Sequence, residues 1–295
     1  MSSTIGSHVS RHDVTGWSAT VYRSVASYVY SPEATASVLQ SLDANPGERI
    51  LDLGCGSGDV TVKIAHLVGP EGIVVGVDLS ENMIAMARET TMLPDIHLIV
   101  GDIQEREFLK KLPTDFVGDC DKVFSNAALH WCSRDPLAVL VNVHRILKEG
   151  GLFVAEMGGH GNIAGVRDAL HAALRKRGID PIARDPWFFP TPEEYTALLR
   201  SAGLEPFHVS LRPRSTSFGD LAGWIRLFGG TFLEGIGSKD KQELVNEVVA
   251  SCRESGACHW DDEKMLWNLE YVRLRVVAAK AGIHGDLQDG RNRLG

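Results

Sequence analysis

Between residues 45 and 160, short aliphatic runs alternate with segments whose apolar residues recur at helical spacing. Such runs are typical of buried parallel strands, which are apolar on both faces and need crossover helices between them. Several of the runs end in or near an acidic residue, as at Asp52, Asp78 and Asp102. Strands and helices repeated in this order predict a doubly wound α/β sheet with its ligand at the carboxyl ends of the strands.

A glycine-rich loop follows the first of these strands, where the chain reads Asp52-Leu-Gly-Cys-Gly-Ser-Gly-Asp59. Glycine lets the backbone turn sharply and approach a ligand, and the helix that follows directs free amides at the loop. The dinucleotide fingerprint Gly-x-Gly-x-x-Gly needs a third glycine where this chain has Asp59. A nicotinamide-dependent dehydrogenase is therefore disfavoured, although Asp78 could accept hydrogen bonds from the ribose of either cofactor class.

The glycines at positions 54, 56 and 58, following Asp52, resemble motif I of the class I S-adenosylmethionine (SAM) dependent methyltransferases. The resemblance covers roughly residues 45–160, because five segments fall where this family places motifs I to V: 50–59, 72–80, 96–103, 120–131 and 149–157. It implies a Rossmann-like sheet of seven strands with N-terminal helices and a helical lid. The last strand would be antiparallel and inserted between the fifth and sixth.

The resemblance also implies which residues hold SAM, with S-adenosylhomocysteine as the product. Asp102 could accept from the adenine amino group while Ile103 covers the ring, and Tyr22 could shield the sulfonium through a cation–π contact. The full set is Asp52, Gly54, Gly56 and Gly58 at the amino-acid end, Asp78 and Met83 on the ribose side, Asp102 and Ile103 at the adenine, Asn126 by the methionyl portion, and Tyr22.

The segment Asn126-Ala-Ala-Leu-His130-Trp131 is a candidate acceptor site. It resembles the Asn-x-x-x-Gln/His-Trp stretch of small-molecule carboxyl methyltransferases of the trans-aconitate, juvenile-hormone-acid and malonyl-carrier types. In that interpretation Trp131 walls the acceptor pocket, while His130 binds the acceptor oxygen or removes its proton. The alternative is structural, with His130 capping a loop and Trp131 packing in the core.

The remaining segments predict one methyltransferase domain over residues 14–280, with a SAM-binding core at 45–160 and a lid and acceptor region at 185–260. Residues 1–13 are expected to be disordered and 281–295 to form a tail. Helices are predicted at 14–42, 163–177, 193–202, 218–232 and 239–252, and a strand at 205–211. Residues 265–280 could be helix or strand by periodicity, and the resemblance implies that they form the antiparallel last strand. A mostly apolar acceptor cavity could be lined by His160, Trp187, Phe188, Phe189, Trp224, Phe228 and Phe232, and the alternative for each of them is packing in the core.

Composition narrows the classes of partner. The net charge of −8 and the lack of a basic stripe disfavour a nucleic-acid partner. No apolar stretch approaches 18 residues, and the first 13 residues lack the apolar region of a secretory signal. An odd count of five cysteines fits a reducing, cytoplasmic location. No metal is expected, because Cys252 and Cys258-His259 match no ligand spacing and Asp119 and Asp121 fit a solvated turn.

These features predict a SAM-dependent methyltransferase that acts on an oxygen of a small organic metabolite. A carboxylate is the preferred acceptor, because it is already ionised near neutral pH and needs no general base. The alternatives are O- or C-methylation of a phenolic or enolic polyketide-type product, or a repurposed SAM-binding fold without methyl transfer. The aromatic lid favours a larger acceptor, and no arginine cluster is evident along the sequence.

Overall fold

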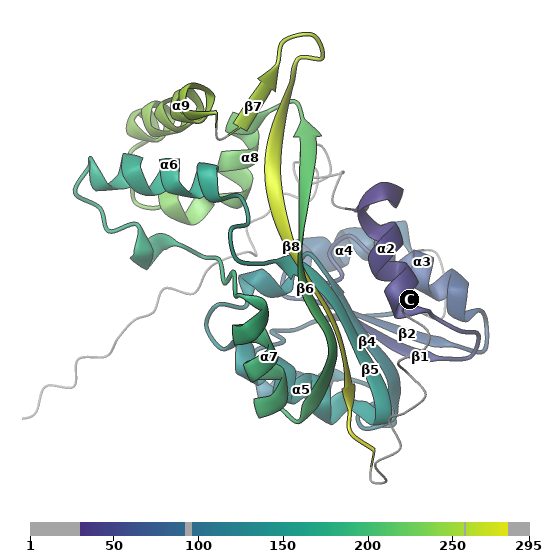
Figure 1. Cartoon of the computed structure of the whole chain (residues 1–295). Coiled ribbons are helices and arrows are strands. Elements are labelled where there is room, and N and C mark those ends of the chain that lie inside the picture. The colour runs from purple at the N-terminus through teal and green to yellow at the C-terminus, as the bar shows by residue number, and fades with distance from the viewer. Residues whose placement is uncertain (1–29, 92–95, 257, 283–295) are drawn as a thin grey trace, which may run out of the picture.

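The computed structural model describes residues 30–91, 96–256 and 258–282. A twisted central sheet carries helices on both faces, and a second group of helices lies beyond one end of it (Figure 1). The strand order is β3-β2-β1-β4-β5-β8-β6, and the short β7 pairs with β8 alone. The strands are β1 Arg49–Leu53, β2 Ile73–Asp78, β3 Ile96–Val100, β4 Cys120–Asn126, β5 Leu147–Gly158, β6 Leu204–Phe218, β7 Cys258–Asp261 and β8 Leu266–Lys280.

Helices connect these strands as the sequence pattern predicts. The α-helices are α2 Pro32–Leu42, α3 Asp59–Val68, α4 Glu81–Thr90, α5 Pro136–Ile146, α6 Ala164–Arg175, α7 Pro192–Ser201, α8 Leu221–Phe228 and α9 Ser238–Ser255. Short 3₁₀ turns are η3 Arg106–Lys111, η4 Leu129–Trp131, η5 Ile182–Arg184 and η6 Gly230–Leu233. Helix α7 begins with a capping box between Thr191 and Glu194. Within the described ranges no helix is long and apolar enough to cross a membrane.

Neighbouring strands from β1 to β5 pair in parallel, whereas β8 runs antiparallel to both β5 and β6. The predicted fold is therefore confirmed, including a last strand inserted between the fifth and sixth. Side chains of β8 alternate between the two faces, so Leu274, Val276 and Ala278 enter the core under α5 and α7. Val277 enters the other core, with Val38 of α2.

The end of the sheet continues into the lid. Strands β6 and β8 extend past β5 as a paired ribbon, and α6, α8 and α9 pack near it (Figure 1). The predicted strand over residues 205–211 was too short, because β6 reaches Phe218 through Pro213. Proline has no backbone N–H to donate to a neighbouring strand. It is tolerated in β6 because this strand lies at the edge of the sheet and pairs on one side only. The β7 strand was not predicted.

The helical pattern predicted over residues 14–42 does not run unbroken, because helix α2 starts only after Ser31. Within the described residues it begins at Pro32, with Ser31 as the N-cap in an extended conformation. A residue before proline avoids the helical region, so Ser31 separates α2 from whatever precedes it. Tyr22, together with the segments 1–13 and 283–295, lies outside the described residues, and the domain limits of 14–280 remain a prediction.

Candidate functional site

The glycine loop connects β1 to α3 and adopts a conformation that side chains would oppose. Gly54, Gly56 and Gly58 all have positive φ angles, of 72°, 56° and 81°. A Cβ at Gly54 would lie 2.1 Å from Cβ of Ala128, whereas a Cβ at Gly56 would meet no atom within 4 Å. The first glycine therefore permits contact between two loops, and the second leaves open space beside the backbone.

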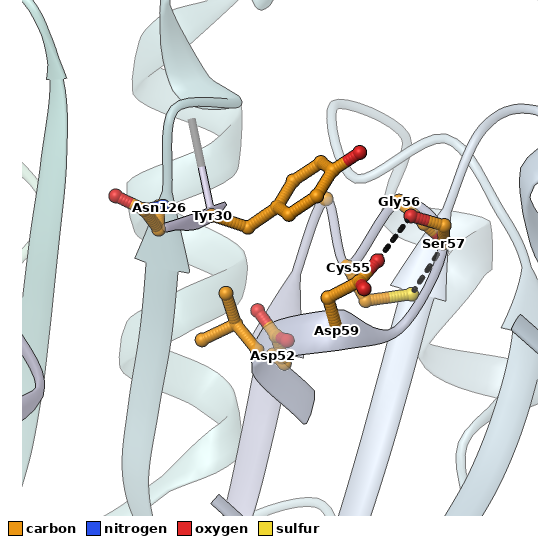
Figure 2. A pocket seen from close by; sticks show the side chains of 9 residues that line it. Tyr30, Asp52, Cys55, Gly56, Ser57, Asp59 and Asn126 are labelled. Atoms are coloured by element: carbon orange, nitrogen blue, oxygen red, sulfur yellow. Dashed lines mark hydrogen bonds between the residues drawn. The ribbon is translucent and has the colours of Figure 1, made fainter. Parts of the chain in front are cut away.

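A pocket with about 380 Å³ of empty space opens beside this loop. Figure 2 shows Asp52 and Asn126 on neighbouring strands and the ring of Tyr30 extending between them and the glycine loop. The sequence assigned no role to Tyr30, which directly precedes the N-cap of α2. The lining residues are Tyr30, Asp52, Gly54, Cys55, Gly56, Ser57, Asp59, Val60 and Asn126.

Asp52 is a buried acid beside this pocket, with only 2% of its surface exposed. Burial raises its pKa to about 7, even though the Thr61 hydroxyl donates a hydrogen bond of 2.7 Å to Oδ2. A carboxylate with so little compensation favours a bound cation. The open space at Gly56 and the acid at Asp52 together fit the charged amino-acid end of SAM.

Asp78 lies at the end of β2 and forms a hydrogen bond with the glycine loop. Its Oδ2 accepts from the Gly56 amide at 3.0 Å and its Oδ1 from the Ser80 amide at 2.8 Å. Burial raises the pKa of Asp78, while these amide hydrogen bonds oppose the shift. Ser80 caps α4, and Met83 is buried on the inner side of that helix. The two carboxylate oxygens retain lone pairs for further donors such as hydroxyls.

Asp102 follows β3 and is held by a residue that the sequence did not single out. Arg134 donates to its Oδ2 at 2.8 Å, and Oδ1 accepts from the Gln104 amide at 2.9 Å. Ile103, next in the chain, is 8% exposed. The predicted adenine residues therefore lie together at the carboxyl edge of β3, with an arginine fixing the carboxylate.

His130 lies in the 3₁₀ turn after β4 and is 7% exposed. The Gly158 amide donates to its Nδ1 at 3.3 Å, which places the proton of the neutral ring on Nε2. Burial, with a smaller effect of the Arg273 charge, lowers the pKa of His130 to about 3. His130 is therefore a neutral hydrogen-bond donor, and its placement does not support the alternative that it removes a proton.

Aromatic side chains surround this histidine. The His130 ring lies 5.4 Å from Trp131 and 5.8 Å from Phe189, measured between ring centroids. Trp131 continues the contacts to Trp187 at 6.0 Å and to Phe228 of the lid at 6.4 Å. Most of the predicted acceptor-region aromatics therefore gather in one cluster, linked further by Trp187–Trp224, Trp187–Phe232 and Trp224–Phe228 contacts.

Trp187, Trp224, Phe228 and Phe232 are buried in the core of the lid, whereas two of the predicted acceptor-region residues lie outside this cluster. His160 is exposed, and Phe188 packs against the core under α5 and α7 rather than in the lid. The cause is alternation along the extended loop: neighbouring side chains face opposite ways, so Phe188 and Phe189 enter different cores. Sequence position alone did not distinguish them.

A buried acid fixes the loop that carries these aromatics. Asp185 accepts from Arg167 Nε at 2.6 Å and lies 3.0 Å from His171 Nε2, both on α6. Its other oxygen accepts from the Trp187 amide at 3.1 Å. Trp187 and Phe189 stack at 5.7 Å two residues later. The Asp185 contacts therefore connect the lid helix to the aromatic cluster.

The residues considered for a metal lie away from this region. Asp121 accepts from the Arg49 amide at 2.7 Å at the start of β4, and Asp119 pairs with the Arg49 side chain at 3.6 Å. Cys252 and Cys258 are buried in the core of the lid. In the part of the chain that the structure describes, no three His, Cys, Asp or Glu side chains form a group that could hold a metal ion.

Comparisons with known proteins agree with this arrangement. Residues 44–177 match a family described as a methyltransferase domain. An uncharacterized methyltransferase of Schizosaccharomyces pombe is 33% identical over 271 residues, covering 90% of this chain and 98% of the relative. Demethylmenaquinone methyltransferase of Staphylococcus aureus is 33% identical over 121 residues, but that match covers 40% of this chain and 46% of the enzyme.

Solved structures share the fold at low identity. A protein described as a methyltransferase from Bacillus halodurans has a TM-score of 0.58 at 18% identity, covering 84% of this chain and 99% of that one. Phosphoethanolamine N-methyltransferase 2 of Haemonchus contortus, bound to S-adenosyl-L-methionine, has a TM-score of 0.54 at 18% identity, covering 91% of this chain and 59% of that one.

The near full-length relative, the matching family and the fold lead to one assignment, and the pocket beside the glycine loop is chemically compatible with its cofactor. The chain belongs to the class I SAM-dependent methyltransferases and is an enzyme that uses S-adenosylmethionine as its methyl donor.

Proposed function

We propose that this enzyme transfers the methyl group to a carboxylate oxygen of a small organic molecule. In this proposal SAM lies along the carboxyl edge of the sheet, with its amino-acid end at Asp52 and the glycine loop. The rest of the proposed cofactor set is Asp78 and Met83 on the ribose side, Asp102 and Ile103 at the adenine, Asn126 by the methionyl portion, and Tyr22 over the sulfonium.

The state of His130 is the observation that carries the choice of a carboxylate. Its Nδ1 accepts from the Gly158 amide, and its pKa near 3 keeps the ring neutral at physiological pH. Such a ring donates a hydrogen bond from Nε2 but does not take up a proton readily. An acceptor that is already ionised needs only orientation and a dry site, because the SAM sulfonium supplies an activated methyl group.

The surrounding side chains suit the body of such an acceptor. Trp131 is a wall of the proposed pocket, and it contacts Phe228 of α8 and Trp187 of the aromatic loop. These faces are apolar and exclude water, which strengthens the attraction between the anionic oxygen and the cationic donor. The proposed acceptor is therefore an acid with an apolar or aromatic body.

A second candidate is methylation of a phenolic, enolic or quinol-type ring. The relative named demethylmenaquinone methyltransferase supports it, although the similarity covers less than half of that enzyme. The aromatic cluster would accommodate a ring equally well. This chemistry would need a base for the ring hydroxyl, and His130 with its occupied Nδ1 does not supply one.

Methyl-labelled SAM separates the two candidates. The purified enzyme is incubated with aliphatic and aromatic carboxylic acids and, in parallel, with phenols and quinols of matched size. We expect label in products that release methanol on mild alkaline hydrolysis, as methyl esters do. Label confined to alkali-stable ethers or ring carbons would overturn the carboxylate proposal in favour of the second candidate.

A further inference from the structure

Arg273 of β8 is a buried cation without an acidic partner in the described part of the chain. Only 4% of its surface is exposed, and its Nε donates to no hydrogen-bond acceptor. Its guanidinium lies 4.5 Å from the centroid of the Tyr271 ring, a cation–π contact that attracts the charge but supplies no anionic partner. Burying a charge without an ionic partner is costly, which makes Arg273 a candidate for binding an anionic ligand.

Two neighbouring arginines show the contrast. Arg275 Nε lies 2.7 Å from Oε2 of Glu156, and Arg214 lies 3.5 Å from Oε1 of the same carboxylate. Both also reach α2, Arg214 at the Ala34 carbonyl and Arg275 at the Ser37 hydroxyl. Glu156 thus contacts two arginines, and Arg273 is the member of this cluster that contacts no carboxylate among the described residues.

Strand register places Arg273 at the acceptor segment. It lies directly opposite Gly158, whose amide holds His130 Nδ1. Residues opposed in this way share a face of the sheet, and a Cβ at Gly158 would lie 2.4 Å from the Phe189 ring. One row further along the strands, Arg275 lies opposite Glu156, which in turn is opposite Asn126 of the cofactor pocket.

We propose that Arg273 is the anion receptor that holds the carboxylate of the methyl acceptor. The planar guanidinium offers paired donors that match a carboxylate, with the His130 ring nearby as a further donor. This inference rests on the proposed carboxyl methylation and adds its specificity determinant: an organic anion whose charge replaces the partner that Arg273 lacks.

The transfer itself is consistent with this placement. One carboxylate oxygen forms a bond to the methyl carbon while the sulfur–methyl bond breaks, and its electron pair stays on sulfur. The sulfonium becomes a neutral thioether, the carboxylate becomes a neutral ester, and no proton is released. The ester no longer pairs with the guanidinium, so methylation weakens the hold of Arg273 on its own product.

Binding measurements test the receptor independently of turnover. The probes are straight-chain and phenyl-substituted monocarboxylates, each compared with its primary amide, added to protein saturated with S-adenosylhomocysteine. In wild-type protein we expect carboxylates, but not amides, to raise the melting temperature and to bind in calorimetry. Arg273→Met should bind the same carboxylates at least about 30-fold more weakly, and Arg273→Lys should fall between the two.

Arg275→Met is the matched control, because Arg275 lies two residues away on the same face but has a partner. It should lower the melting temperature by leaving Glu156 undercompensated, whereas Arg273→Met should maintain or raise it. Equal carboxylate binding by wild type and Arg273→Met would overturn the receptor. Carboxylate binding that depends on Arg273 but yields no labelled ester would support the receptor and overturn carboxyl methylation.

Discussion

Gly158 donates its backbone amide to Nδ1 of His130 at 3.3 Å and lies opposite Arg273 in the β5–β8 pair. A single backbone position therefore links the neutral histidine to the buried arginine. The histidine comes from the turn after β4 and the arginine from the antiparallel strand. Their proximity depends on the insertion of β8 beside β5, which brings the end of the chain to the carboxyl edge.

A neutral His130 predicts how activity depends on pH. Because its pKa is near 3, the enzyme should show no loss of kcat/KM with a midpoint near 6.5 that is due to this residue. His130→Gln, which can retain a donor, should lose less activity than His130→Phe. The measurement is kcat/KM from pH 5 to 9 for the three proteins. An acid limb near 6.5 that disappears in His130→Gln would show that the histidine acts as a base.

The ionised form of Asp52 should favour cofactor binding but lower the stability of the folded protein. Its pKa rises from near 4 in an unfolded chain to about 7 in the folded protein. The folded state therefore binds a proton that the unfolded chain has lost, and stability from this group, full at low pH, is lost as pH rises toward 7. Asp52→Asn should melt roughly 5 °C higher than wild type above pH 7 and equally below pH 4.

The same variant should lose SAM binding, because the amide cannot balance the cofactor's ammonium group. Wild-type affinity should weaken below pH 7 by up to about tenfold per pH unit, as protonation removes the carboxylate charge. Calorimetric titration with SAM from pH 5.5 to 8.5 checks both statements. Asp59→Asn serves as the control. Asp59 lines the same pocket and accepts a hydrogen bond from Ser57, but it is less buried than Asp52, so its variant should lack the stability gain. Unchanged SAM affinity in Asp52→Asn would contradict the assignment.

A side chain at Gly54 should impair SAM binding through a steric clash rather than through backbone strain. Gly54→Ala and Gly69→Ala both place a side chain at positive φ, 72° and 67°, at a cost on the order of 1–3 kcal/mol each. Only Gly54 has an obstacle, the Ala128 Cβ at 2.1 Å, because Gly69 has no atom within 4 Å. Gly54→Ala should therefore abolish SAM binding while Gly69→Ala preserves it.

Adding Ala128→Gly to the Gly54 variant removes the obstacle and should restore part of the affinity. Isothermal titration of the two single variants and the double variant provides the measurement. If Gly69→Ala lost SAM binding to the same extent, backbone strain and not the contact with Ala128 would be the cause.

Replacing Asp185 should change the binding of the acceptor but not the binding of SAM. Asp185→Asn weakens the contacts to Arg167 and His171, so the loop bearing Trp187 should be held less firmly. Its side chain is 5% exposed, and disrupting such a buried network costs about 3 kcal/mol of stability. We expect KM for the acceptor to rise about tenfold while SAM affinity stays unchanged.

Glu247→Gln is the control for this change. Glu247 pairs with Lys176 and Arg177 at the more exposed end of the α6–α9 contact, so its loss should cost under about 1 kcal/mol and leave KM unchanged. Chemical denaturation and steady-state kinetics measure both variants. A fall in SAM affinity in Asp185→Asn would place its effect at the cofactor instead.

The strand and loop geometry around the proposed cofactor site could be predicted because its signals are local. The strand, the acid and the glycine loop are adjacent in sequence, so the pocket at Asp52 and the cap at Ser80 follow from short-range geometry. The helical pattern was carried through Ser31 because its apolar spacing continues there, whereas the proline that follows sets the start of α2 at the next residue. The Arg134–Asp102 pair was missed because it joins loops 32 residues apart.

The amino-acid sequence by itself determined the alternation of strands and helices, the glycine loop and the class of cofactor, because periodicity and turn chemistry act over a few residues. Only the tertiary structure decided which side chains meet across the sheet. No arginine cluster was visible along the chain, yet the β6–β8 register brings Arg214 beside Arg273 and Arg275 from about 60 residues away. The three guanidinium groups carry the same charge but differ in their partners. Glu156 contacts two of them, whereas Arg273 lacks an acidic partner among the described residues.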